Sequence, residues 1–222
     1  MPVTQAELDD LWDFDDAAAS EVRLRAAADV EEDPVRRAEL ATQVARALGL
    51  QGRFDEGHTV LDGVQAGQAD GAASSARRGA ARVATRVVLE RGRLRSSQGD
   101  PETARVLFED AVRLAQAAEE PFLRVDALHM LAITDPERAG RWTDDALAVL
   151  ATTPDPRTQR WAVSLHNNLG WALFDAGDLD GALTEMEAAQ AAASQSGTPE
   201  QTRWAHEAVA EVRAAIRHRD AD

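Results

Sequence analysis

The chain has 222 residues, of which 44% are hydrophobic and 28% are charged, a composition typical of a soluble folded protein and not of a disordered one. Its net charge of −15 repels phosphate backbones and anionic lipid, so we expect neither a nucleic acid nor a membrane as a partner. It contains no cysteine, which excludes disulfides, thiolate metal sites and a cysteine nucleophile.

The negative charge is concentrated at the start of the chain, where residues 1–33 hold eleven carboxylates and two arginines. This start lacks the basic residues and the apolar stretch of a secretory signal, and no apolar run approaches the roughly 20 residues that span a bilayer. We therefore expect a cytoplasmic protein. All 24 basic residues are arginine, a bias that indicates a GC-rich and, we expect, bacterial genome.

The acidic start also carries large apolar residues. Acidic residues interleaved with Leu11, Trp12 and Phe14 are typical of short motifs that dock into basic apolar grooves, so the segment is a candidate occupant of its own groove or of a neighbour's. The alternative, which we favour, is that Leu8, Leu11 and Trp12 lie at helical spacing and cap the end of a helical stack.

Proline placement predicts where helices begin. Six of the eight prolines follow a residue that can begin a helix, and proline suits the first helical position because its missing N–H would have no partner there. These pairs are Asp33-Pro34, Asp100-Pro101, Glu120-Pro121, Asp135-Pro136, Asp155-Pro156 and Thr198-Pro199. Thr4 and Thr198 each stand three residues before a Glu or Gln, which predicts capping boxes.

No strand-like run of alternating β-branched residues interrupts the chain, so we expect an all-α fold in one continuous domain, 1–222. The expected helix pairs are residues 4–29 (degenerate), 34–66, 73–119, 121–152 (shortened) and 157–196, followed by a capping helix at 199–219. A flexible loop is expected at 67–75, where glycine, alanine and serine are frequent.

Three of the helix pairs share a pattern of small and large residues, aligned on Ala45, Gly92 and Gly170. Each has glycine seven residues later, a small residue twelve later, a large apolar residue sixteen later, and Val or Ala nineteen later. In the same order they are Gly52, Gly99 and Gly177; Gly57, Ala104 and Ala182; Leu61, Phe108 and Met186; Val64, Ala111 and Ala189. The glycine predicts a left-handed helix stop. The small residues let two antiparallel helices approach closely, and each pair must then stack on a neighbour.

The last copy, residues 169–173 and 177–182 followed by Met186, resembles a tetratricopeptide repeat. The copies around Gly92 and Ala45 are less regular, and tyrosine is replaced throughout. The resemblance implies a solenoid of antiparallel helix pairs forming a right-handed superhelix, with a concave groove that binds peptides or partner proteins. The lysine-rich carboxylate clamp of cochaperone relatives is absent, because the chain has no lysine.

Catalytic constellations are missing from the sequence. It has no glycine-rich phosphate loop, no paired histidines at metal spacing and no nucleophile elbow, and its five histidines are scattered singly. We therefore expect no enzymatic activity, no metal and no cofactor.

Helical spacing in the first helix of each pair predicts the groove. Offsets of 0, 4, 7 and 11 give one stripe of residues per pair, and we expect the three stripes to adjoin across the stack. The stripes are Ser164, Asn168, Trp171 and Asp175; Arg86, Glu90, Arg93 and Ser97; Glu39, Gln43, Arg46 and Leu50.

The residue types of the stripes suit peptide recognition. The amide of Asn168 can donate to a peptide carbonyl and accept from its N–H, and Trp171 offers a flat apolar anchor. Arginines at 46, 86 and 93 can fork onto carboxylates. The structural alternatives are that Arg86 pairs with Glu90 on a helix surface and that Trp171 packs between repeats.

We therefore expect an adaptor that binds a peptide or partner protein in its concave face. A regulatory sensor that closes on a small peptide, and a scaffold that self-associates through the acidic terminus, are the alternatives. Ligand-induced compaction would favour the sensor, and a concentration-dependent mass would favour the scaffold.

Overall fold

All six proline starts predicted above are the first residues of helices in the computed structural model, which describes residues 3–67 and 74–220. Four of the residues before these prolines cap the helix through a side-chain oxygen, namely Asp33, Asp100, Asp155 and Thr198. Thr4 and Thr198 form the predicted capping boxes. Asp135 differs, because its carboxylate instead accepts a hydrogen bond from the indole of Trp142 at 3.0 Å.

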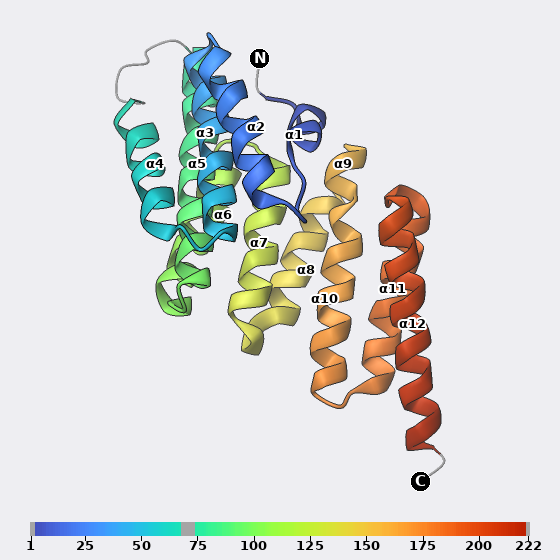
Figure 1. Ribbon diagram of the computed structural model, residues 1–222. Helices are drawn as coiled ribbons and strands as arrows, with labels where there is room; N and C mark the ends of the chain where they lie inside the picture. The colour runs from blue at the N-terminus through green and yellow to red at the C-terminus, as the bar shows by residue number, and fades with distance from the viewer. Residues whose placement is uncertain (1–2, 68–73, 221–222) are drawn as a thin grey trace. The chain divides into compact units, whose positions relative to one another are not determined.

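The described residues form helices and no strand, which confirms the all-α fold (Figure 1). The helices are α1 (Gln5–Leu11), α2 (Ala17–Val30), α3 (Pro34–Leu50), α4 (Phe54–Gly67), α5 (Ser74–Ser97), α6 (Pro101–Ala117), α7 (Pro121–Thr134), α8 (Ala139–Leu150), α9 (Pro156–Gln159), α10 (Trp161–Asp175), α11 (Leu179–Ser196) and α12 (Pro199–Arg219), with a 3₁₀ turn η1 (Pro136–Arg138) before α8. The loop expected at 67–75 lies mostly outside the described residues, which stop at 67 and resume at 74.

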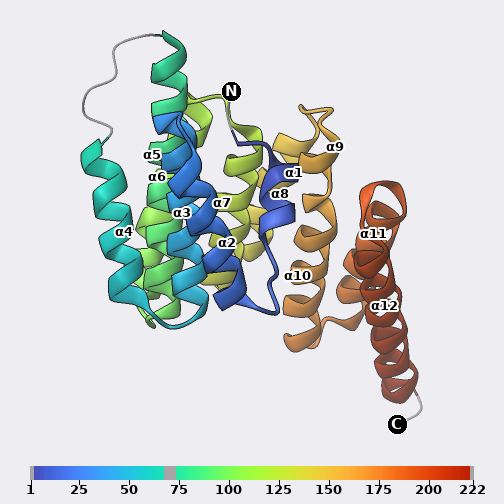
Figure 2. The ribbon, with the colours of Figure 1, turned by 45° about the horizontal axis from the view of Figure 1, so that its top comes forward.

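Contacts group the chain into two compact units, Met1–Leu123 and Arg124–Asp222, and each is described here by itself. In the first unit, α3 packs against α2, α4 and α5, and α5 packs against α6. In the second, α10 packs against α8 and α11, and α11 packs against α12 (Figure 2). The single domain and the right-handed superhelix expected from the sequence stay predictions.

The close approach of paired helices occurs where the small residues predicted it. A Cβ atom added to Gly92 of α5 would lie 2.5 Å from the Phe108 ring of α6, and one added to Gly170 of α10 would lie 2.9 Å from Met186 of α11. Both large side chains are fully buried, and so are Ala104 and Ala182. The glycines therefore create the space that the large residue sixteen positions later fills.

The turns inside the helix pairs share one backbone geometry. Gly52, Gly99 and Gly177 have φ of 74°, 79° and 83°, as predicted for helix stops. The next residue in each case donates its N–H to the carbonyl five positions earlier, as Asp100 does to Arg95 at 3.0 Å. Glu119 adopts the same left-handed conformation after α6, with φ of 55°, although it is not glycine.

The start of the chain forms two helices, α1 and α2, where a degenerate helix pair was expected at residues 4–29. Helix α1 has only seven residues and contacts α2 little, whereas α2 packs mainly against α3. Leu8 of α1 is 1% exposed and belongs to the apolar cluster that includes Leu24 of α2 and Leu40 of α3. The physical reason is that one buried leucine anchors α1 to this cluster, and a two-turn helix has no second stripe with which to build a pair.

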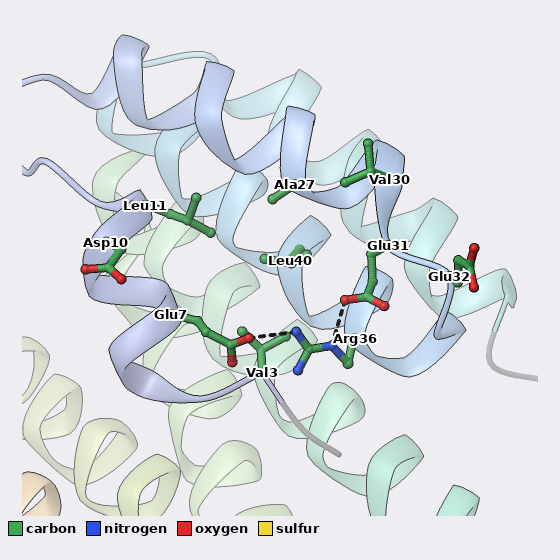
Figure 3. Close-up of a pocket in the computed structure, with 10 residues that line it drawn as sticks. All are labelled: Val3, Glu7, Asp10, Leu11, Ala27, Val30, Glu31, Glu32, Arg36 and Leu40. Atoms are coloured by element: carbon green, nitrogen blue, oxygen red, sulfur yellow. Dashed lines mark hydrogen bonds and ion pairs between the residues drawn. The ribbon is translucent and has the colours of Figure 1, made fainter.

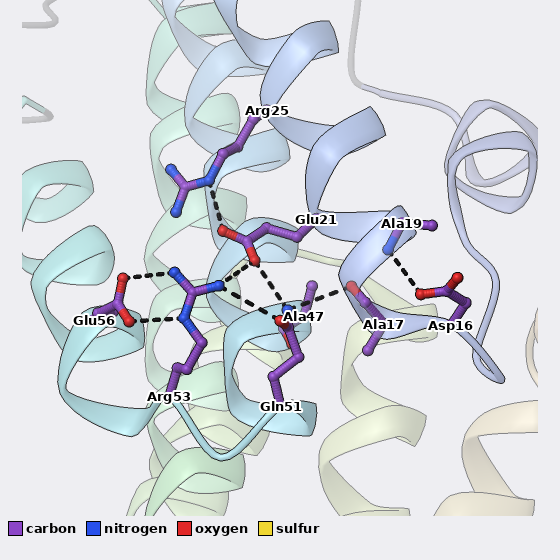
Figure 4. A network of polar contacts seen from close by, with 9 residues as sticks. All are labelled: Asp16, Ala17, Ala19, Glu21, Arg25, Ala47, Gln51, Arg53 and Glu56. Atoms are coloured by element: carbon purple, nitrogen blue, oxygen red, sulfur yellow. Dashed lines mark hydrogen bonds and ion pairs between the residues drawn. The ribbon is translucent and has the colours of Figure 1, made fainter.

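A polar network fixes α2 to the turn between α3 and α4 (Figure 4). The carboxylate of Glu21 accepts hydrogen bonds from Arg53 at 2.5 Å and from Gln51 at 2.9 Å, and Arg53 also pairs with Glu56 at 2.6 Å. Burial opposes the charge on Glu21, but hydrogen bonds from Gln51 and Arg25 outweigh it and lower the pKa of the carboxyl. The network therefore ties three helices together beside the first turn.

Candidate peptide-binding face

The stripe predicted on α3 is in contact with the N-terminal segment of the chain. The backbone N–H of Val3 donates to Oε2 of Glu39 at 2.8 Å, and the indole N–H of Trp12 donates to Oε1 of Gln43 at 3.1 Å. We call Glu39, Gln43 and Arg46 the α3 stripe, and residues 3–14 the N-terminal segment. Each of the three stripe residues contacts this segment.

Arg46 completes this contact through two aromatic rings. Its guanidinium carbon lies 5.6 Å from the ring centroid of Trp12 and 5.4 Å from that of Phe14, within the range of cation–π attraction. The two rings are stacked on each other, with centroids 4.9 Å apart. Helix α1 ends at Leu11, and Trp12 has an extended backbone, which lets side chains two residues apart point to the same side.

We expected the α3 stripe to line a groove. In the structure it is covered and is not an open surface. Glu39 is 1% exposed and Gln43 is 3% exposed, because the N-terminal segment lies on them. Both interpretations of that segment hold in part. Leu8 and the partly buried Leu11 pack on the first core cluster, as expected of a cap, while Trp12 and Phe14 reach the predicted groove residues.

Glu39, which the N-terminal segment covers, belongs to a buried group of charged side chains. Its Oε1 pairs with Nε of Arg82 on α5 at 2.9 Å, and the same nitrogen lies 3.4 Å from Oε1 of Glu120. Burial raises the pKa of the Glu120 carboxyl, Arg82 and Arg86 oppose this shift, and Glu39 adds to it. One carboxylate, Glu39, thus connects the first residues of the chain to α5 and to the end of α6.

The stripe predicted on α5 is also largely buried. Arg86 is 8% exposed and Glu90 is 1% exposed, whereas Ser97 at the end of the helix is exposed. Nη1 of Arg93 donates to Oε1 of Glu90 at 2.6 Å. Helix α5 packs directly on α3, and Arg82, one turn before Arg86, pairs with Glu39 of the first stripe. That the stripes themselves adjoin stays a prediction. Leu50, the last residue of the first stripe, is 56% exposed.

The third stripe lies on α10 in the second unit and is more accessible. Asp175 is exposed, and Ser164, Asn168 and Trp171 are partly buried. Within the described residues, the side-chain amide of Asn168 makes no hydrogen bond, so its donor and acceptor remain available. Trp171 packs against the cluster around Met186 and meets Phe174 edge-on at 5.4 Å, which agrees with the packing alternative for this residue.

A cleft of about 500 Å³ opens beside α1, between α2 and α3 (Figure 3). Arg36 bridges it, donating to Glu7 at 2.9 Å and to Glu31 at 2.6 Å. The hydrogen bond from Arg36 lowers the pKa of Glu7 to about 2, with a smaller contribution from Thr4. This guanidinium is therefore occupied by carboxylates of the chain itself.

Sequence reasoning missed two residues of the first unit that matter for this face. Arg82 lies four residues before Arg86, so extending the α5 stripe by one turn would have found it. Glu120 gives no such signal, because it follows the end of α6 and reaches Arg82 only through the fold.

Two features are absent from the described residues. No helix there is long and apolar enough to cross a bilayer. Residues 3–67 and 74–220 likewise contain no group of three or more His, Asp or Glu side chains that could hold a metal ion.

Comparison with known proteins gives a likeness of fold. No family model matches the chain, and no curated protein matches it. Among solved structures, the chain is similar to the crystal structure of BtubC (BKLC) from P. vanneervenii, with a TM-score of 0.59 and 16% sequence identity. The match covers 95% of this chain and 92% of that one, and supports an all-α helical-repeat fold.

Proposed function

We propose that this chain is a repeat protein of the tetratricopeptide type, acting in the cytoplasm as an adaptor that binds a peptide or an extended segment of a partner protein, and that it catalyses no reaction. The proposed binding residues are those of the α3 and α5 stripes in the first unit and, separately, those of the α10 stripe in the second. The fold supports the proposal only in general terms, because one fold serves many functions.

The observation that carries the proposal is the contact between the α3 stripe and the N-terminal segment. Glu39 accepts a backbone N–H, Gln43 accepts an indole N–H, and Arg46 faces two aromatic rings. A bound peptide would make the same kinds of contact, with backbone groups held by polar side chains and aromatic residues as anchors. The free amide of Asn168 offers the same chemistry on α10.

Selection from a random-peptide display library on the full chain tests the proposal. The affinity of each selected peptide is then measured for the wild type, for Asn168→Ala and for Asn167→Ala, which removes the same side chain from the neighbouring position. We expect Asn168→Ala to weaken binding about tenfold, the equivalent of one lost hydrogen bond of about 1.4 kcal/mol, and Asn167→Ala to change it little. Equal effects of the two substitutions, with both variants folded, would remove the α10 stripe from the site. If the library yields no peptide that binds the chain, the proposed function is refuted.

A further inference from the structure

The two ends of the N-terminal segment are held very differently. Val3 and Leu8 are 6% and 1% exposed and belong to the first core cluster, so α1 is an integral part of the first unit. Phe14 is 62% exposed; its ring stacks on Trp12 and lies 5.4 Å from the guanidinium carbon of Arg46. Trp12 lies between these extremes, because it packs against the same cluster and the next residue, Asp13, is hydrogen-bonded to Ser20 of α2. The ring of Phe14 is therefore the part of the segment that can leave the α3 stripe most readily, with Trp12 next, while Leu8 stays buried.

The carboxylates around the aromatic pair define the chemistry of this end. The order Trp12, Asp13, Phe14, Asp15, Asp16 alternates rings with acids and then continues with an acid. The Asp13 carboxylate accepts the N–H of Asp15 at 3.0 Å, and that of Asp16 caps α2, so these acids shape the turn that presents the rings. The face that receives them is cationic at Arg46, which attracts both aromatic faces and carboxylates.

We infer that the α3 stripe recognises a short acidic segment with two aromatic residues two positions apart, and that Trp12 and Phe14 are the chain's own copy of this segment, which a partner must displace. This inference rests on the proposed function and adds the class of ligand and a built-in competitor. The apparent affinity of the face for a partner is then the intrinsic affinity multiplied by the fraction of molecules in which the aromatic end has left the stripe.

The test uses the full chain and a fluorescent peptide of residues 7–16, ELDDLWDFDD, with a second peptide in which Trp and Phe are replaced by Ala. Binding is measured by anisotropy for the wild type, for Phe14→Ala and for Trp12→Ala/Phe14→Ala. Because Phe14 is 62% exposed, its substitution alone leaves the core untouched and keeps the test valid if the double variant unfolds.

We expect the aromatic peptide to bind the double variant at least tenfold more tightly than the wild type, with Phe14→Ala between them. Adding Arg46→Gln to the double variant should weaken binding about tenfold. Adding Arg113→Gln, which removes an equal charge from an exposed arginine paired with Asp110, should not. The alanine peptide should bind none of the chains measurably.

Four results would overturn the inference. Equal affinity of the peptide for the wild type and both opened variants would show that the segment does not compete. Equal effects of Arg46→Gln and Arg113→Gln would show that the binding is nonspecific attraction. Wild-type dimers that Phe14→Ala dissociates, seen by sedimentation, would assign the face to a second copy. Display-selected peptides that lack acids and aromatic residues, yet bind the same stripe, would refute the ligand class and leave the proposed function standing.

Discussion

Replacing Gly92 by alanine should destabilise the first unit although alanine is the better helix former. The new Cβ would lie 2.5, 2.7 and 3.0 Å from three atoms of the Phe108 ring, where carbon atoms prefer about 3.5–4.0 Å. The ring is fully buried and rigid, so it must shift by about 1 Å within a packed core, and such overpacking costs about 1–3 kcal/mol. The higher helix propensity of alanine offsets about 1 kcal/mol of this cost. The net expected loss is about 0–2 kcal/mol.

Two matched substitutions separate the clash from helix preference. At Gly170 the nearest atom is the terminal methyl of Met186, a flexible side chain that can move aside, so Gly170→Ala should be close to neutral. At Gly63 of α4, apart from the adjoining backbone of its own helix, no atom of the described residues lies within 4 Å of an added Cβ, so Gly63→Ala should raise the free energy of unfolding by up to about 1 kcal/mol. Both controls carry the same chemical change as Gly92→Ala.

Urea unfolding followed by far-ultraviolet circular dichroism measures these differences, with the midpoint and the slope compared for each variant. A chain with two compact units need not unfold in one step, so Gly63→Ala, in the same unit as Gly92, is the closer control. Shortening the ring in Gly92→Ala/Phe108→Leu should recover part of the loss. The reasoning fails if Gly92→Ala is as stable as Gly63→Ala, or if Gly170→Ala loses more than Gly92→Ala.

The other predictions concern turns, buried charge and capping. Glu119→Gly should raise the free energy of unfolding by about 1 kcal/mol and Gly99→Ala should lower it by about 1–2 kcal/mol, because only glycine adopts positive φ without strain; urea unfolding that gave both the same sign would contradict this. Burial raises the pKa of Glu120, so its proton binds more tightly in the folded state, and the free energy of unfolding of the wild type relative to Glu120→Gln should grow as the pH falls from about 7 to about 5. Urea titrations at both pH values measure this difference, which a constant value would refute. Thr198→Ala should cost about 1 kcal/mol by removing the cap of α12, and should appear in hydrogen exchange as faster opening of that helix alone.

Local features of this fold were predictable because their causes lie within a few residues. A proline with a capping residue before it decides a helix start on its own, and a glycine at positive φ decides a helix stop. The offsets from Gly92 to Ala104 and Phe108 extend this to a helix pair, since two helices joined by a short turn must meet at a fixed spacing.

What covers a face could not be predicted in the same way. The period of α3 identified Glu39, Gln43 and Arg46 as one stripe, but the same period describes a stripe that is open, buried or occupied. Trp12 reaches Gln43 across 31 residues, and nothing in the spacing of either segment records that contact. The position of α1 is a similar case: a helix was expected there, but it takes its place from a cluster formed by two later helices.

Glu39 joins parts of the chain that are synthesised at different times. Val3 precedes it by 36 residues, and Arg82 and Glu120 follow it. At about 5–20 residues per second, Arg82 is made roughly 2–9 s after Glu39. During that interval the α3 stripe exists without the cation that balances its carboxylate. Glu39, although made before α5, therefore pairs with its buried cation only after residue 82 has been added to the chain.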